Sequence, residues 1–168
     1  MILDYRIWDE VEKIQLITKF LEENKDKITA LELSSNSISP IVAKHLSEKI
    51  QHLPYLQYAN FNDIFVSRKK DQIPIALKDL MLAILDKPIR ILNLSNNAFG
   101  LIGVQSIDFF IKNTKNLMEL YIENCGLGPE GSELLASLLM ENENKLNLEV
   151  LVINRNRLEV KGTIAFSK

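Results

Sequence analysis

The chain has 168 residues, 46% of them hydrophobic and 25% charged, with a formal net charge of -2 at pH 7. This composition is that of one folded globular domain, and the near-neutral charge argues against a dedicated nucleic-acid binder. The single cysteine, Cys125, excludes an internal disulfide and a cysteine-type zinc site, and no apolar run approaches the roughly 20 residues of a membrane span. With no signal-peptide pattern at the N-terminus, these features favour a reducing, intracellular setting.

The first predicted element is an amphipathic helix at residues 9–25. Its apolar residues recur at intervals of three or four, which places them on one face of a helix. They are Val11, Ile14, Ile17 and Leu21. Because this helix precedes the first repeated pattern, we expect residues 1–27 to cap the N-terminal end of the structure that follows.

From residue 28 onward, one pattern of apolar residues returns along the chain. It fits the template L-x-x-L-x-L-x-x-N-x-L, which is typical of leucine-rich repeats. The third anchor of the template recurs at intervals of roughly 28, 33, 28 and 31 residues, and the second copy is the weakest. These anchors are Leu33, Phe61, Leu94, Ile122 and Ile153. Each central L-x-L predicts a short strand with apolar side chains facing inward, and the Asn or Cys that follows suits a tight bend.

A helical pattern of apolar residues lies between successive strands. The predicted helices span residues 40–53, 73–85, 101–111 and 129–140. Alternating strands and long helices resemble the ribonuclease-inhibitor type of leucine-rich repeat. We therefore predict an α/β leucine-rich-repeat solenoid, with short parallel strands on the concave face of an arc and helices on the convex face. Residues 1–168 form one domain, with about five repeats from residue 28 to 168.

The C-terminal end carries no pattern comparable to the N-terminal cap. Ala165 and Phe166 are expected to begin a further helix, so the last repeat is incomplete. A solenoid needs a polar terminal cap to stay soluble. We expect a fragment, a truncated gene model, or a chain whose last strand pairs with something else.

Several catalytic or ligand-binding motifs are weak here. Gly126–Gly131 matches the dinucleotide fingerprint G-x-G-x-x-G, but polar residues separate it from the preceding strand, which favours a repeat turn. His45 and His52 lie on one predicted helix without further metal ligands nearby in the sequence. Cys125 has no histidine at a spacing that suggests nucleophilic catalysis. The sequence therefore shows no active site of its own.

An insertion lengthens the second repeat and contains the basic run Arg68-Lys69-Lys70-Asp71. Such a run is most often a solvated loop. Its surroundings, N-D-I-F-V-S-R-K-K-D-Q-I-P-I-A-L from Asn62 to Leu77, resemble the D-I-F-T-G-R-x-K-D-E-I-P-like stretch of the Ran GTPase-activating protein (RanGAP) family. Three further segments agree with that family in order and spacing, at residues 94–100, 120–129 and 154–159. The resemblance covers about residues 28–160.

The resemblance implies stimulation of GTP hydrolysis by the small GTPase Ran, in its GTP form. It implies an activator that completes its partner's active site, not an enzyme with substrate chemistry of its own. No cofactor of its own is expected, because GTP and Mg²⁺ belong to the bound Ran. It also implies a cytoplasmic location that extends to the nuclear periphery. We further expect a monomer that has no membrane span and does not bind nucleic acid.

The RanGAP family is understood to work without an arginine finger. An asparagine on a loop after a strand helps to hold Ran's own catalytic glutamine against the attacking water, and it aligns with Asn124. An arginine of the family insertion is important for activity, and it aligns with Arg68. The remaining residues expected to contact Ran are Lys70, Asp71, Asn96, Arg155 and Arg157. Asn96 stands where the family has Asp, and Ser67 stands for a glycine.

The loops that follow the strands of a solenoid stack along one edge. We therefore expect Arg68, Asn96, Asn124 and Arg155 to line one ridge. The alternative is a plain leucine-rich-repeat scaffold that binds a protein through its concave strand face and has no effect on any GTPase. That face is predicted to present Glu32, Asn60, Asn93, Tyr121 and Val152.

Overall fold

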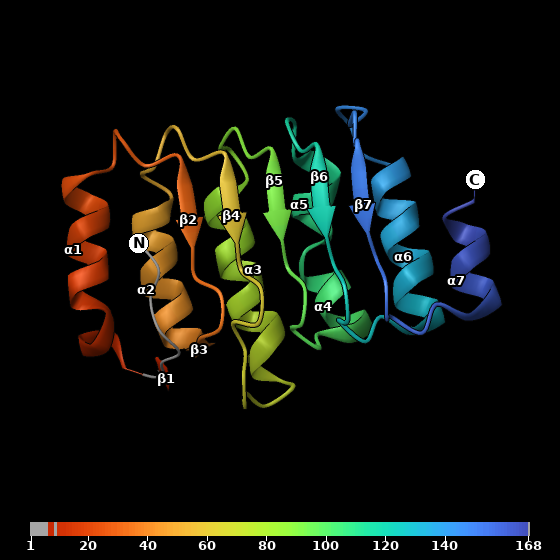
Figure 1. Ribbon diagram of the computed structural model, residues 1–168, viewed down its shortest axis with the longest axis horizontal. Helices are drawn as coiled ribbons and strands as arrows, with labels where there is room; N and C mark the ends of the chain where they lie inside the picture. The colour runs from red at the N-terminus through yellow and green to blue at the C-terminus, as the bar shows by residue number, and fades with distance from the viewer. Residues whose placement is uncertain (1–6, 9, 168) are drawn as a thin grey trace.

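The computed structural model describes residues 7–8 and 10–167, which form a two-layered solenoid with strands on one side and helices on the other (Figure 1). Among these residues, one sheet has five parallel strands in the order β2-β4-β5-β6-β7. The strands are β2 (Ala30–Glu32), β4 (Tyr58–Asn60), β5 (Ile91–Asn93), β6 (Glu119–Tyr121) and β7 (Val150–Val152). The predicted leucine-rich-repeat fold, with one short strand per repeat, is confirmed.

Each strand is followed by a helical crossover that returns the chain along the far side of the sheet, so that the next strand is parallel to the last (Figure 1). The helices are α2 (Pro40–Ile50), α3 (Gln72–Ile84), α4 (Gly100–Ser106), α5 (Asp108–Asn113), α6 (Gly128–Met140) and α7 (Glu159–Ala165). Pro40 begins α2 and the Ser39 side chain caps it, accepting the Val42 N–H.

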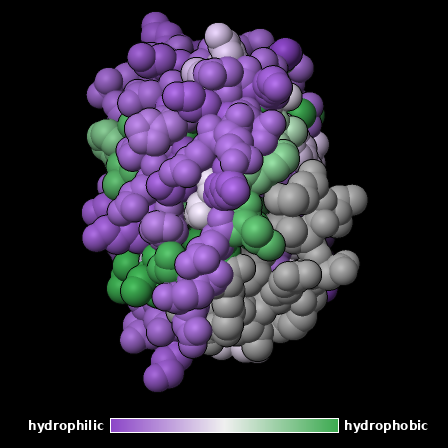
Figure 2. Space-filling model, turned by 90° about the vertical axis from the view of Figure 1, so that its left-hand side faces the viewer, coloured by the Kyte–Doolittle hydropathy of each residue, from purple (hydrophilic) through white to green (hydrophobic). Residues whose placement is uncertain are grey.

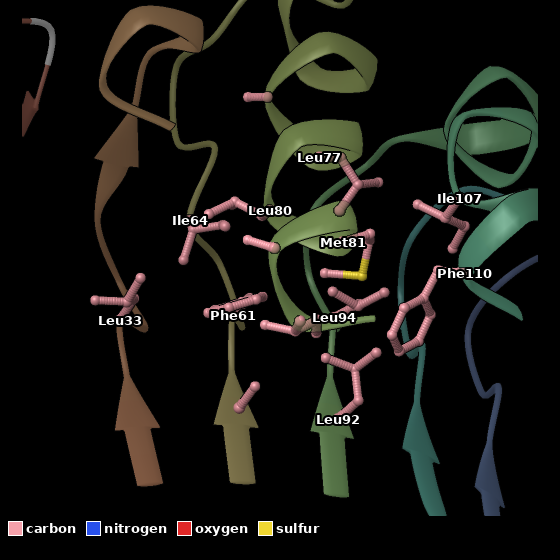
Figure 3. Close-up of a cluster of buried hydrophobic side chains, with 14 of the residues drawn as sticks. Leu33, Phe61, Ile64, Leu77, Leu80, Met81, Leu92, Leu94, Ile107 and Phe110 are labelled. Atoms are coloured by element: carbon pink, nitrogen blue, oxygen red, sulfur yellow. The ribbon is translucent and has the colours of Figure 1, made fainter. Parts of the chain in front are cut away.

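The core lies between the sheet and these helices (Figure 3). The residue after each strand points into this layer, and Leu33, Phe61 and Leu94 are all buried there. On the opposite side Leu77, Leu80 and Met81 of α3 meet them, with Ile107 and Phe110 further along (Figure 3). Because every repeat supplies the same inward positions, one continuous apolar layer runs through the arc.

A buried asparagine joins adjacent repeats. The side-chain amide of Asn97 donates to the carbonyl of Phe61 at 2.7 Å and to that of Leu94 at 2.8 Å, and its oxygen accepts the Ile64 N–H at 2.9 Å. Asn97 is 2% exposed, so water replaces none of these bonds. One side chain therefore fixes both its own turn and that of the preceding repeat.

The same position is occupied by Asn156 and Cys125 in later repeats. The Asn156 oxygen accepts the Cys125 N–H at 2.7 Å, and its amide donates to the carbonyls of Ile122 and Ile153. The buried Cys125 thiol donates instead to the Leu94 carbonyl at 3.2 Å. Cys125 thus fills a structural position in the turn, as its place in the repeat indicates.

The N-terminal end is covered by a 3₁₀ turn at Val11–Ile14 and by α1 (Gln15–Glu23). Ile14, Ile17 and Leu21 are buried where this segment packs against the first repeat. The drawn outer surface at this end is mostly hydrophilic (Figure 2). A short parallel pair, β1 (Ile7–Trp8) with β3 (Ser37–Ile38), adds a connection that the repeat pattern did not predict.

Several predicted helix boundaries differ from the structure; the helix predicted at 40–53, for example, ends at Ile50. The helix predicted at 9–25 begins with the 3₁₀ turn, and residue 9 lies outside the described part of the chain. The helix predicted at 101–111 is divided into α4 and α5 by a non-helical residue, Ile107, which is buried. The prediction that Ala165 begins a helix is wrong, because α7 ends there. Across the described residues, every helix is too short or too polar to cross a bilayer.

Replacing Asn97 by alanine is expected to destabilise the fold by about 2–4 kcal/mol, because two carbonyls and one N–H lose their buried partner. Urea denaturation measures this change as a shift of the midpoint. Asn147→Ala is the matched control, because Asn147 is exposed in the loop before β7 and should shift stability by less than about 0.5 kcal/mol. Equal shifts in the two variants would contradict the bridging role.

Candidate functional site

The loops that follow β2, β4, β5, β6 and β7 lie side by side along one edge of the sheet (Figure 1). We call this edge the post-strand ridge, comprising residues 34–35, 62–71, 95–98, 123–126 and 154–157. Backbone hydrogen bonds tie successive loops together at 2.8–2.9 Å. The backbone N–H of Asp63 donates to the carbonyl of Ser95. In the same way, Asn96 donates to Glu123, and Asn124 donates to Asn154. The ridge is therefore a fixed surface built from residues far apart in sequence.

Three asparagine side chains form a chain of amides along this ridge. The amide nitrogen of Asn124 donates to the Asn96 oxygen at 2.9 Å, and that of Asn96 donates to the Asn62 oxygen at 2.8 Å. Asn96 and Asn124 are exposed to solvent. Among the residues that the structure describes, none donates to the Asn124 oxygen, which is left as an oriented acceptor at the end of the chain.

The backbone of the ridge holds these side chains outward. Asn96, Asn124 and Arg155 occupy equivalent turn positions with φ of 61°, 53° and 59°. Asparagine tolerates this left-handed region better than most residues, because its short polar side chain bonds locally. Arg155 adopts the same conformation without that advantage, so the turn itself is imposed by the repeat.

Arg68 lies in the insertion at the same edge, but its guanidinium points back toward the first repeat. It donates to the backbone carbonyl of Ser37 in β3, and the Ser37 hydroxyl donates to the carbonyl of Val66. The backbone N–H of Arg68 also donates to the Phe65 carbonyl, at 3.0 Å. Arg68 is half-buried, so this geometry makes it an anchor for the insertion.

The predicted site residues thus divide into groups. The side chains of Asn96 and Asn124 are hydrogen-bonded to each other. Arg155 lies in the next loop, directly after Asn154, whose carbonyl accepts the backbone N–H of Asn124. Arg157 is exposed in the same loop. The other two residues, Lys70 and Asp71, are exposed where the insertion leads into α3, and Asp71 makes no side-chain capping bond there.

One member of the amide chain, Asn62, was not predicted as a site residue. Its position after β4 matches that of Ser95 after β5, since the strands pair Asn60 with Asn93. The sequence does show that Asn62 is a polar residue two places after a repeat strand, which places it in the ridge. Sequence alone does not show that its side chain reaches Asn96.

Within the ridge, burial shifts the pKa of two titratable groups. Burial raises the pKa of the Asp63 carboxyl above its usual range. Burial also raises the pKa of the Cys125 thiol to about 12, and neighbouring backbone N–H groups only partly offset it. A thiol with that pKa is a poor nucleophile.

The glycine-rich segment serves the repeat turn. Gly126 and Gly128 have positive φ, and the Gly128 N–H donates to the Asn156 carbonyl at 2.9 Å. Gly100 occupies the equivalent place one repeat earlier, where its N–H donates to the backbone carbonyl of Cys125. In a dinucleotide-binding loop the backbone N–H groups donate to a phosphate. Here the N–H groups of Gly100 and Gly128 already donate to carbonyls of the next repeat.

Similarity to known proteins agrees with this architecture. A family model described as "Leucine Rich repeat" matches residues 87–107, so the protein is a leucine-rich-repeat protein. Over 157 residues the chain is 34% identical to Ran GTPase-activating protein 1 of Xenopus laevis, covering 87% of this chain and 27% of that protein. It is 35% identical to Ran GTPase-activating protein 1 of Saccharomyces cerevisiae, covering 78% of this chain and 35% of that protein.

A third relative, the Ran GTPase-activating protein of Drosophila melanogaster, is 31% identical over 92% of this chain and 28% of its own length. Over most of its length, the chain is therefore homologous to proteins of the Ran GTPase-activating protein family. It spans about a quarter to a third of the length of these relatives.

The raised pKa of Cys125 predicts that iodoacetamide leaves the native protein unmodified at pH 8. With a pKa of about 12, only about one thiol in ten thousand is ionised at that pH, and burial blocks access to it. Mass spectrometry counts the adducts, and the same protein in concentrated urea should be fully alkylated. Rapid alkylation of the folded chain would show that the turn opens readily.

Proposed function

We propose that this chain stimulates GTP hydrolysis by Ran, and that it acts on Ran's active site through the post-strand ridge. Homology to proteins named Ran GTPase-activating protein supports the choice of partner. The observation that carries the proposal is the amide chain, in which Asn96 holds Asn124 with its oxygen unoccupied among the described residues. The GTP and Mg²⁺ of the reaction are brought by Ran in its GTP form.

Hydrolysis of GTP needs a water molecule held in line with the γ-phosphate, and a glutamine of the GTPase orients that water. A glutamine side chain is flexible, so restricting it lowers the entropic part of the barrier. In our proposal the Asn124 oxygen accepts an N–H from that glutamine, which leaves the glutamine oxygen to face the water. Asn96 acts as a positioning residue, because its own oxygen already holds the amide nitrogen of Asn124.

The basic residues of the ridge serve docking in this proposal. Arg155, Arg157 and Lys70 are exposed, and exposed charges at the edge of an interface mainly accelerate encounter and fix orientation. Arg68 does not act as an arginine finger in this scheme, since its guanidinium engages the Ser37 carbonyl. It holds the insertion in the shape that Ran meets. We place the activity in the cytoplasm, with one monomer acting on one Ran.

Asn124→Ala is expected to lower the saturated rate of GTP hydrolysis by about 100-fold, because the glutamine loses its restraint. Single-turnover hydrolysis on Ran loaded with GTP, with the chain in excess, measures this rate. Asn147→Ala is the matched control, an exposed asparagine at the opposite ends of the strands. A full rate with Asn124→Ala would refute the proposed role of Asn124. No stimulation by the unmodified chain, together with no binding to Ran, would refute the proposed function itself.

Arg68→Ala is expected to raise the concentration of chain needed for half-maximal stimulation about tenfold, while the saturated rate stays within about twofold. The reason is that the variant releases the insertion from β3 without touching the amide chain. The same titration measures both quantities, and Lys70→Ala serves as a comparison in which charge is lost but the anchor remains. A fall confined to the saturated rate would contradict this docking role and would instead indicate that Arg68 acts at the phosphates of the GTP bound to Ran.

A further inference from the structure

The amide chain of the post-strand ridge has two chemically different ends. At one end Asn124 is exposed, and its oxygen is left over for a partner. At the other end Asn62 is half-buried, and its oxygen accepts the amide nitrogen of Asn96 at 2.8 Å. The half-buried end has the fewer rotamers to choose from, because neighbouring atoms occupy part of the space around it.

The loop that carries Asn62 is held from both sides. Its backbone N–H donates to the side-chain oxygen of Asn60 at 3.0 Å, and its carbonyl accepts the backbone N–H of Ser35 at 3.0 Å. Asn60 is fixed in turn, because its amide nitrogen donates to Glu32 at 2.9 Å and a carboxylate only accepts. The side chain of Asn62 therefore projects from a fixed point of the backbone.

A row of asparagine side chains can run in either of two directions. Each amide has a donor on one side and an acceptor on the other, and a half-turn about the last side-chain bond exchanges them. In the observed direction Asn124 donates to Asn96, so the Asn124 oxygen stays free. In the reverse direction Asn124 would accept from Asn96 and would present its amino group instead. The direction decides which chemical group Asn124 offers to a partner.

Asn96 does not settle this direction by itself. Its side chain is exposed, and an exposed side chain changes rotamer within picoseconds to nanoseconds. Its oxygen accepts from Asn124 and its nitrogen donates to Asn62, so it passes on whichever direction its neighbours impose. Of these two neighbours, only Asn62 is half-buried. The oxygen of Asn62 turns the amide nitrogen of Asn96 toward itself, which leaves the Asn96 oxygen for Asn124.

The repeat alone does not produce the contact between Asn96 and Asn62. The strands pair Asn60 with Asn93, and three residues further along each loop lie Asp63 and Asn96. Asp63 shares the left-handed backbone of Asn96, with φ of 54° against 61°. A row built by the repeat alone would run from Asn96 to Asp63, but the amide of Asn96 reaches Asn62, one residue earlier. The contact therefore depends on which side chain occupies position 62.

We propose that Asn62 is a positioning residue for GTP hydrolysis on Ran, which acts on Asn124 through Asn96 by fixing the direction of the amide chain. This inference rests on the proposed function. In the observed direction the Asn124 oxygen accepts an N–H of Ran's glutamine. In the reverse direction the amino group of Asn124 bonds only the glutamine oxygen, and so takes that oxygen away from the attacking water.

The first test is single-turnover hydrolysis on Ran loaded with GTP, with the chain in excess. Asn62→Ala is expected to lower the saturated rate about three- to fivefold, because both directions of the amide chain become populated. Asn62→Asp is the matched control, since a carboxylate of the same size only accepts, and its rate should stay within about twofold of the unmodified chain. A full rate with Asn62→Ala, or equal losses in the two variants, would overturn the proposal.

The same substitution in a second background separates positioning from a loosened loop. In Asn96→Asp both side-chain oxygens accept, so the row no longer has a direction to fix. There, adding Asn62→Ala should change the saturated rate by less than about 1.5-fold. A purely structural role of Asn62 would cost the same in both backgrounds, and that result would overturn the proposal.

Nuclear magnetic resonance of the free protein, labelled with ¹⁵N-asparagine, tests the direction without Ran. The amide protons of Asn124 are assigned by their loss in Asn124→Ala. In Asn62→Ala they should move toward the positions of a free amide, although residue 62 does not touch Asn124, and in Asn62→Asp they should stay in place. Unmoved signals in Asn62→Ala would overturn the proposal. Failure of the unmodified chain to stimulate Ran would instead refute the proposed function, and this measurement would still decide whether Asn62 fixes the direction.

Discussion

The structure depends on the buried polar side chains that follow four of the five repeat strands, at Asn36, Asn97, Cys125 and Asn156. Strands of only three residues bury too little surface to fix their own positions, and the turns after them leave backbone groups without sheet partners. Asn97 satisfies three such groups at once, two of them in the neighbouring repeat. The neighbouring repeats are thereby joined by directional bonds as well as by apolar contact. The precision of the post-strand ridge follows from this, because each loop is held by the one beside it.

In the ridge, the stacking of adjacent loops also holds exposed side chains in place. A single exposed asparagine would sample several rotamers, whereas Asn124 is held by Asn96, and Asn96 by Asn62. Each link depends on adjacent loops being in register, which the buried asparagines secure. An amide that must meet a partner's side chain in one orientation gains from this arrangement, since little conformational entropy is left to lose on binding.

Much of this architecture could be predicted from sequence, because the repeat is a local pattern. The strand at 91–93 and the helix after it follow from alternating and helical spacing of apolar residues. What could not be predicted is non-local. The bond from Arg68 to Ser37 joins residues 31 apart, and the contact of Asn62 with Asn96 depends on how two loops stack. The break at the buried Ile107 likewise has no counterpart in the local pattern, which is continuous through residues 101–111.

The post-strand ridge and the concave face are chemically separate, but some of the same residues support both. The side-chain oxygen of Asn60 accepts the Asn62 N–H at 3.0 Å, at the start of the ridge, while its amide donates to Glu32 on the concave face. Asn93 accepts the Ser95 N–H in the same way. Asn60 therefore fixes both a ridge loop and a carboxylate of the concave face. A solenoid repeats its geometry, so one strand residue can order the loop at the end of its strand and a side chain on the neighbouring strand without any change of backbone.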